Sequence, residues 1–226
     1  MRTDENTLIR HSVIFDMDGT LIDPLLGISN SYDHMCLSLG IPSISEDEVR
    51  RLIGPPIQVA LSEFFGFDQP TLERAVKLFR SHYSSQGILE YRKYPGIDEL
   101  LLGLHQYGLG LHIVTNKPVV FANRIVQDAG WDSLFSSVNG SSLDNPQSSK
   151  KDMISSVIKI LSPDGSVIAY IGDRPEDASG SHFNGLPFVG VSWGFSTKEE
   201  LIEAGALAVA GSMQQLGIAI RNLQAI

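Results

Sequence analysis

The chain has 226 residues, of which 42% are hydrophobic and 19% charged, so it can bury a sizeable core and is not an intrinsically disordered protein. Its net charge of −9 argues against nucleic acid or an anionic membrane as a partner. Cys36 is the single cysteine, so an internal disulfide is excluded, and a small buried hydrophobe explains it better than a catalytic thiol. The polar start at residues 1–6 lacks the apolar core of a signal peptide, and no apolar run approaches the ~20 residues of a membrane span. We therefore expect a cytoplasmic protein, either a monomer or a homodimer.

The first predicted element is a buried strand over residues 12–15, a short apolar run that ends in Asp16-Met17-Asp18-Gly19-Thr20. Because side chains alternate along an extended chain, Asp16 and Asp18 are expected to point the same way at the strand end. Two carboxylates held this close repel each other, so a cation or a shared proton must offset them, and both suit chemistry on phosphate. The plain alternative is a turn that is rich in Asp and Gly.

The next seventy residues or so have helical periodicity and little strand character. Gly40 and Pro42 are typical of the end of a first helix, and Ser45 with Glu48 resembles a capping box that opens a second. We expect an all-helical insert over residues 23–91. Its predicted helices cover residues 25–39, 46–53, 56–65 and 71–86.

From Pro95 onward, helical and strand patterns alternate, which predicts an α/β fold with a parallel sheet and helices on both faces. In such sheets ligands bind beyond the carboxyl ends of the strands, where the strand order reverses, so the helical insert would be a lid over that edge. Residues 141–149 are most simply a loop. The predicted strands cover 111–115, 137–139, 167–171, 188–191 and 207–210, and the predicted helices 97–107, 119–129 and 150–161, with others on either side of the last strand.

Polar residues also follow two later strands of this predicted sheet. Thr115-Asn116-Lys117 precedes a helix that starts near Pro118, and a hydroxyl beside a helix N-terminus suits a phosphate oxygen. Gly172-Asp173 follows the strand over 167–171, so Asp173 could complete a hard-cation site. Ordinary helix caps are the alternative for each.

Lys150 is a further candidate site residue, and it lies at the start of a predicted helix. A positive charge there opposes the helix dipole, so a nearby anion is one explanation and a solvated lysine is the other. The neighbouring Lys151 could take the same place after a shift of one residue.

In the order in which they follow along the chain, these four segments resemble the four sequence motifs of the haloacid dehalogenase-like superfamily. The resemblance covers nearly the whole chain. Tyr94-Pro95-Gly96 resembles the return to the core after a helical cap. The resemblance implies a Rossmann-like parallel-sheet core of residues 1–22 and 92–226 and a helical cap of residues 23–91. The matching residues are Asp16-Met17-Asp18-Gly19-Thr20-Leu21, Thr115, Lys150, and Gly172-Asp173 with Asp177.

The resemblance also implies a phosphomonoester hydrolase that acts through an aspartyl phosphate. Asp16 would be the nucleophile, and Asp18 would protonate the leaving alcohol and later activate water. Thr115 and Lys150 complete the implied catalytic set. The implied phosphate-binding residues are Asp16, Gly19, Thr115, Asn116 and Lys150.

The implied cofactor is Mg²⁺. It would lie between Asp16, the backbone carbonyl of Asp18 and Asp173, with Asp177 either ligating it or orienting a ligand. Metal, lysine and backbone amides would together stabilise the charge that spreads over the phosphoryl oxygens in the transition state.

The cap resembles that of phosphoglycolate phosphatases and of related 5′-nucleotidases, which implies a small phosphate ester as substrate and directs Arg51, Gly54 and Pro55 toward it. A solvated helix face is the alternative for Arg51. Pro24 departs from the Ser or Thr common after Asp23 in these enzymes. Two other functions remain open: a phosphosugar mutase with the same core residues, and a non-catalytic domain that holds phosphate.

Overall fold

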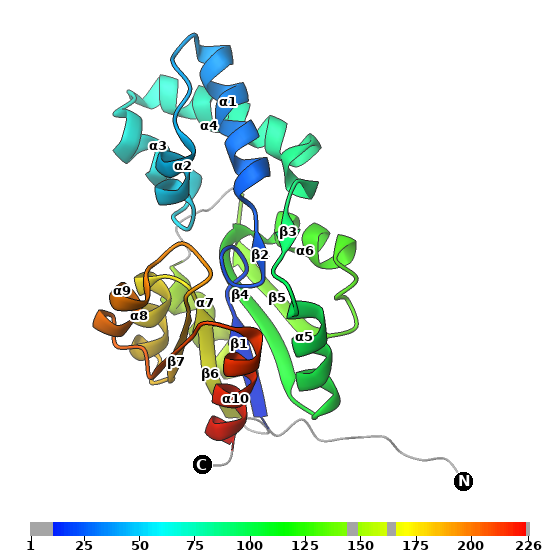
Figure 1. The fold of residues 1–226 in the computed structure, drawn as a ribbon. Helices are drawn as coiled ribbons and strands as arrows, with labels where there is room; N and C mark the ends of the chain where they lie inside the picture. Colours follow the sequence, from blue (N-terminus) through cyan, green and yellow to red (C-terminus); the bar gives the residue numbers. More distant parts are fainter. Residues whose placement is uncertain (1–10, 144–148, 162–165, 225–226) are drawn as a thin grey trace.

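The computed structural model describes residues 11–143, 149–161 and 166–224 (Figure 1). A six-stranded parallel sheet forms its centre, in the order β5-β4-β1-β6-β7-β8, which confirms the predicted α/β fold. β1 lies between β4 and β6, so the strand order reverses beside it. The polar start at 1–6 and most of the loop expected at 141–149 lie outside the described residues. The strands are β1 (His11–Phe15), β4 (Gly110–Pro118), β5 (Phe135–Ser141), β6 (Ser166–Gly172), β7 (Phe188–Val191) and β8 (Ala208–Ala210).

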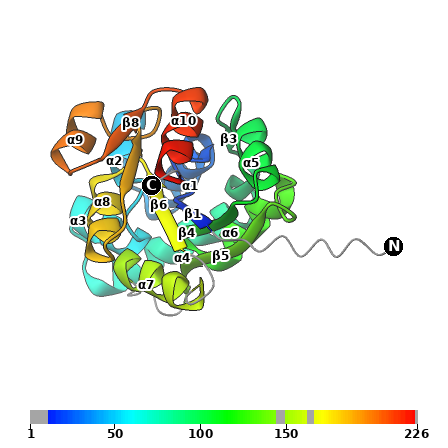
Figure 2. The ribbon, with the colours of Figure 1, turned by 90° about the horizontal axis from the view of Figure 1, so that it is seen from below.

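Helices cover both faces of the sheet (Figure 2). Along β1 the buried side chains alternate: Val13 and Phe15 belong to the core on one face, and Ile14 packs with Tyr170 and Phe188 on the other. Burial on both faces explains why these strands have continuous apolar sequences. The first face carries α5 (Ile97–Gln106), α6 (Val119–Asp128) and α10 (Met213–Gln224), and the second carries α7 (Lys150–Leu161), α8 (Pro175–Phe183) and α9 (Lys198–Glu203).

The insert that follows β1, residues 24–91, is helical, as predicted, and lies beyond the carboxyl ends of the strands as a cap (Figure 1). Its two connections to the core pair as short antiparallel strands, β2 (Ile22–Asp23) and β3 (Arg92–Lys93). Two residues are too few to show a strand pattern, which is why the sequence did not predict this ribbon. The cap helices are α1 (Leu25–Leu39), α2 (Glu46–Leu52), α3 (Ile57–Phe65), α4 (Gln69–Ser85) and the 3₁₀ helix η1 (Gly87–Leu89).

Several element boundaries differ from the prediction by one to three residues, and two of these differences have a clear physical reason. α4 starts at Gln69, two residues early, because the Asp68 side chain accepts a hydrogen bond from the Thr71 N–H (3.0 Å) and a proline is tolerated in the first helical turn. β4 continues three residues past 115 and still pairs with β5, Pro118 lying opposite Ser141. Asn116 and Lys117, which the prediction left between the strand and the next helix, are therefore strand residues.

No helix in the described residues combines the length and the apolar character that a bilayer span requires.

Candidate active site

The end of β1 places Asp16 and Asp18 at the point where the strand order reverses. The Asp16 N–H donates to the Ile171 carbonyl at 2.8 Å, so Asp16 still pairs with β6. A tight turn follows, in which Gly19 has φ +84° and its N–H donates to the Ile22 carbonyl at 2.8 Å. Glycine adopts this left-handed conformation without a steric penalty. Both carboxylates are thus mounted on rigid backbone.

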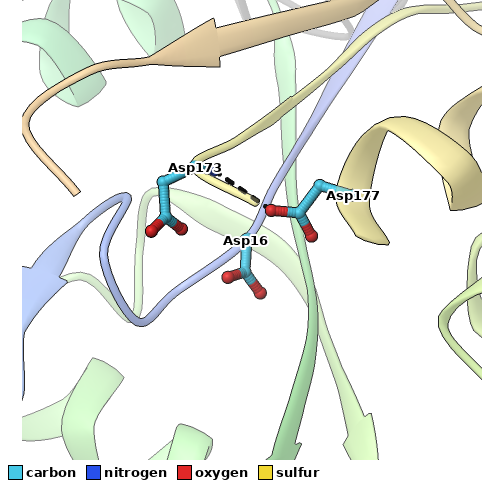
Figure 3. A group of neighbouring side chains, drawn as sticks. All are labelled: Asp16, Asp173 and Asp177. Atoms are coloured by element: carbon cyan, nitrogen blue, oxygen red, sulfur yellow. Dashed lines mark hydrogen bonds between the residues drawn. The ribbon is translucent and has the colours of Figure 1, made fainter. Parts of the chain in front are cut away.

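Three buried carboxylates gather here: Asp16, Asp173 directly after β6, and Asp177 in the first turn of α8 (Figure 3). One oxygen from each lies within 4.8 Å of the other two. Backbone amides hold the cluster, since Asp177 Oδ2 accepts from the N–H groups of Asp173 (3.1 Å) and Arg174 (3.0 Å). Asp173 Oδ2 accepts from the Phe195 N–H at 2.8 Å.

The cluster is electrostatically costly by itself. Burial raises the pKa of Asp173 well above its ordinary value, and the nearby charges of Asp177 and Asp16 add to this. Burial also raises the pKa of Asp177, to about 6, although Lys150 acts in the opposite direction. Positive charge would relieve this repulsion.

The donor set fits a hard divalent cation, because it consists of carboxylate oxygens only. Two glycines leave space around Asp173: an added Cβ would lie 2.2 Å from Asp173 Oδ2 at Gly19 and 2.4 Å from Asp173 Cβ at Gly194. Any larger residue at either position would displace the carboxylate. The structure therefore brings Asp16, Asp173 and Asp177 together in a group that could hold a metal.

Lys150, at the start of α7, adds a cation to this cluster. Its Nζ lies 3.0 Å from Asp16 Oδ1 and also pairs with Asp177 Oδ1. Burial alone would lower the pKa of Lys150, but the two carboxylates outweigh it and the pKa is raised. Lys151 lies elsewhere, with its Nζ 5.3 Å from the centre of the Phe183 ring. Of the two lysines, Lys150 is the one beside Asp16.

Asp18 has different partners. Lys117 Nζ lies 2.8 Å from Asp18 Oδ2 and donates a hydrogen bond to the Tyr83 hydroxyl at 2.7 Å. Tyr83 belongs to α4, so this group of residues joins the core to the cap. Burial raises the pKa of Asp18, and Lys117 opposes the increase.

The sequence prediction gave Lys117 no role. Alternation along an extended chain could not have placed it, because β4 is irregular between Thr115 and Pro118 and the alternation of sides is interrupted there.

Thr115 and Asn116 lie on the strand next to Asp16. Ile113 pairs with Phe15, and Thr115 lies two residues beyond that pair, at the level of the turn after β1. Thr115 is buried, and its hydroxyl accepts from the Lys117 N–H at 3.3 Å. The Asn116 side chain donates to the Gly54 carbonyl of the cap at 2.9 Å.

Of the three predicted cap residues, Gly54 and Pro55 line a cavity of about 90 Å³ between the cap and the core. Arg51 is exposed on α2 and lies outside the residues that line this cavity. Arg174, which the sequence prediction did not assign, donates to the carbonyls of Arg50 (2.9 Å) and Ile53. The loop after α2 is thus held from the core by Asn116 and Arg174.

Comparison with known proteins places this geometry in a family. The family model described as haloacid dehalogenase-like hydrolase matches residues 13–191. A 5′-nucleotidase from Pseudomonas aeruginosa is 34% identical over 190 residues, which cover 84% of this chain and 86% of that protein. A phosphoglycolate phosphatase from Vibrio parahaemolyticus is 26% identical over 212 residues, covering 90% of this chain and 93% of that protein.

Another relative has a different name. The tyrosine-protein kinase PtkA from Mycobacterium tuberculosis is 32% identical over 183 residues, which cover 81% of this chain and 62% of that protein. This chain thus spans less than two thirds of PtkA. Among solved structures, a predicted phosphatase from Clostridium acetobutylicum superposes with a TM-score of 0.86 at 34% identity, covering 95% of this chain and 99% of that one.

Proposed function

This chain belongs to the haloacid dehalogenase-like hydrolase family, and from that premise we propose that it is a Mg²⁺-dependent phosphatase that hydrolyses a small phosphate monoester through a phosphorylated Asp16. One observation carries the proposal. Two carboxylates on one strand end have separate partners, Asp16 with Lys150 and Asp18 with Lys117. Phosphoryl transfer by this route needs two carboxyl groups with separate duties.

In this proposal Asp16 attacks phosphorus and the ester oxygen leaves. Lys150, whose Nζ already lies 3.0 Å from Asp16, offsets charge on the phosphoryl oxygens. The Thr115 hydroxyl and the backbone amides of Gly19 and Asn116 hold the same oxygens. The energetic contribution of these groups is positioning and charge stabilisation, which dominate catalysis of phosphoryl transfer.

Asp18 would give its proton to the leaving alcohol and then take one from the water that hydrolyses the phosphorylated Asp16. Two features support this assignment. Lys117 engages only Asp18 Oδ2, and Oδ1 is buried without a hydrogen-bond partner among the described residues. Asp18 also lines the cavity between cap and core, where a leaving group would lie.

Asp16, Asp173 and Asp177 would hold Mg²⁺, together with the backbone carbonyl of Asp18. When bound, the cation supplies positive charge next to the phosphoryl oxygens. The buried, all-oxygen cluster supports this choice of metal.

The relatives support a small phosphorylated metabolite as substrate, of the nucleoside 5′-monophosphate or the phosphoglycolate type. We also propose that residues 1–22 and 92–226 form the catalytic core and residues 23–91 the cap, because β2 and β3 pair where the chain passes between them. A cytoplasmic location agrees with the single, buried Cys36.

The test is a phosphate-release assay on purified, EDTA-treated protein with p-nitrophenyl phosphate, AMP and 2-phosphoglycolate, with and without Mg²⁺. We expect many turnovers that require Mg²⁺ and disappear in Asp16→Asn, whereas Asp132→Asn, an exposed control, keeps them. Conversion of a sugar phosphate without phosphate release would indicate a mutase. Stabilisation by inorganic phosphate without turnover would indicate a binding domain, and either result contradicts the proposal.

A further inference from the structure

Three residues that line the cavity between cap and core each carry a buried polar atom that lacks a hydrogen-bond partner among the described residues: Asp18 Oδ1, the Tyr32 hydroxyl and Gln58 Oε1. They come from different elements, namely the end of β1, α1 and α3. Leaving a buried polar group unpaired is unfavourable, and native structures contain few such groups. Three of them around one cavity point to a ligand that supplies the missing partners.

Tyr32 is the most informative of the three. Its side chain is 1% exposed, and its ring packs edge-on against Phe79 with 4.9 Å between ring centres. Phenylalanine would satisfy that packing equally well, so packing does not explain the hydroxyl. Burial also raises the pKa of Tyr32, which keeps the hydroxyl neutral and able to donate as well as accept.

We propose that this cavity binds a leaving group that carries at least one free hydroxyl, of the glycerol or pentose type, and that Tyr32 and Gln58 bind this hydroxyl. The inference rests on the proposed function, because it takes Asp18 as the residue that acts on the ester oxygen. Within that function it selects alcohols with further hydroxyls, such as the ribose of a nucleotide, over the glycolate of phosphoglycolate.

Hydrogen-bond chemistry separates these two classes. In the orientation that the Gln58 amide has here, its unpaired Oε1 accepts a hydrogen bond, which a hydroxyl can donate; a carboxylate would pair with Gln58 only after the amide turns to present Nε2. The same hydroxyl can accept from Tyr32. Lys117, a cation that could pair with a carboxylate, is already bonded to Asp18 and Tyr83.

The rest of the wall agrees with a short carbon skeleton. Apolar side chains from both sides line the cavity, among them Ile28, Phe79 and Phe121. Arg80 also lines the cavity and donates to the Leu143 carbonyl at 3.3 Å. A cation in the cavity wall is the feature that would favour a leaving group with a carboxylate over one with a hydroxyl. A carboxylate-bearing ester therefore belongs in the test.

The experiment compares kcat/KM for four esters on the intact, Mg²⁺-loaded protein: ethyl phosphate, sn-glycerol 3-phosphate, ribose 5-phosphate and 2-phosphoglycolate. p-Nitrophenyl phosphate is included to test phosphatase activity independently of the cavity. We expect both hydroxyl-bearing esters to exceed ethyl phosphate by about tenfold or more, as one or two added hydrogen bonds allow, and 2-phosphoglycolate to fall below them.

Two variants then test the residues. In Tyr32→Phe and in Gln58→Leu the ratio of kcat/KM for sn-glycerol 3-phosphate to that for ethyl phosphate should fall toward one. Tyr107→Phe, which changes an exposed tyrosine outside the cavity, should keep the wild-type ratio. Gln58 is only half-buried, so its variant still decides the matter if Tyr32→Phe fails to fold.

Three results would overturn the inference while p-nitrophenyl phosphate is still hydrolysed: equal rates for glycerol and ethyl esters, a preference for 2-phosphoglycolate, or an unchanged ratio in both variants. Absence of release from every ester, p-nitrophenyl phosphate included, would instead overturn the proposed function and this inference with it.

Discussion

Asp16 and Asp18 are two residues apart, yet they lie in different kinds of surroundings. The Asp16 group is built entirely from the core, by β1, β6, α7 and α8; backbone amides hold the carboxylates of Asp173 and Asp177, and Lys150 pairs with that of Asp16. The Asp18 group depends on one ion pair to Lys117 and, through it, on Tyr83 of the cap. The core alone therefore completes the proposed phosphoryl-binding half of the site, which we call the core half. The cap completes the proposed acid–base half, which we call the cap half.

The Asp16 and Asp18 groups also differ in how far their contacts depend on the position of the cap. The amides that bind Asp173 and Asp177, and the Lys150 side chain that pairs with Asp16, all belong to the core, so these contacts do not depend on where the cap lies. The contact between Lys117 and Tyr83 is made by two side chains across a junction, and it breaks when the cap moves away. Cap motion above an active site is common in enzymes and governs when chemistry proceeds.

The largest effect should come from the core half. Asp16→Asn removes the proposed nucleophile and also relieves carboxylate repulsion, so we expect phosphate release to fall by about 10⁴-fold or more while the melting temperature holds or rises. The measurement is steady-state phosphate release together with a thermal melt. Turnover within tenfold of wild type would show that the core half does not contain the nucleophile.

Lys117→Met tests the half shared with the cap. Without the ion pair Asp18 loses its orientation, so we expect turnover of ethyl phosphate to fall by about 10²-fold or more, whereas p-nitrophenyl phosphate loses much less because its leaving group needs little protonation. Lys151→Met is the matched control, since Lys151 lies against Phe183. Equal losses on both esters would show that Lys117 serves the fold or phosphate binding rather than the acid–base step.

Gly194→Ala tests how tightly the core half is built. The added Cβ would lie 2.4 Å from Asp173 Cβ, so the carboxylate must shift. We expect the Mg²⁺ concentration for half-maximal activity to rise by roughly 10-fold, the effect typical of disturbed metal-site support. Gly103→Ala, on the open side of α5, is the control. An unchanged Mg²⁺ concentration for half-maximal activity would show that Asp173 does not help to bind the metal.

Lowering the pH should stabilise the folded state of the metal-free protein, through Asp177 of the core half. Because the pKa of Asp177 is raised to about 6 in the folded protein from 3.8 in the unfolded chain, the folded state takes up a proton first as pH falls. The free energy of unfolding should therefore rise by roughly 1 kcal/mol between pH 7.5 and 5.5 through this group.

Urea denaturation of wild type and Asp177→Asn in EDTA measures this rise, since their difference cancels groups elsewhere, such as the buried His112. Saturating Mg²⁺ should remove the rise, because the cation then offsets the charge in place of the proton. A difference between the two proteins that is constant with pH would contradict the prediction.

Strand ends explain what the sequence could predict. Asp16, Asp173 and Thr115 follow apolar runs that read as parallel strands, and parallel strands bring their carboxyl ends to one edge. Their approximate location therefore needed no knowledge of the loops. The predicted strand end at Thr115 came three residues too early, because the pairing of Pro118 with Ser141 extends β4, and pairing between distant segments leaves no local trace.

The contacts of the cap half could not be predicted from the sequence, because they depend on tertiary structure. That Tyr83 would reach Lys117 follows from how α4 packs over the core, and helical periodicity gives the buried face of α4 but not what it faces. The same holds for Arg174, whose contacts with the loop after α2 join residues more than a hundred positions apart. Arg51, assigned from the cap resemblance, is exposed on α2.

The central place of β1 has a consequence for how this chain folds. β1 comes first among the described strands along the chain, yet Ser12 pairs with Gly110 and His11 with Ser166. The strand that carries Asp16 therefore stays half-paired until β6 has left the ribosome, and such distant pairings make folding slow and expose unpaired strand edges. We expect a chain that stops at residue 161 to aggregate rather than fold into a smaller domain, which sedimentation of the expressed fragment would show, and a soluble, folded fragment would mean that β4 alone suffices to hold β1.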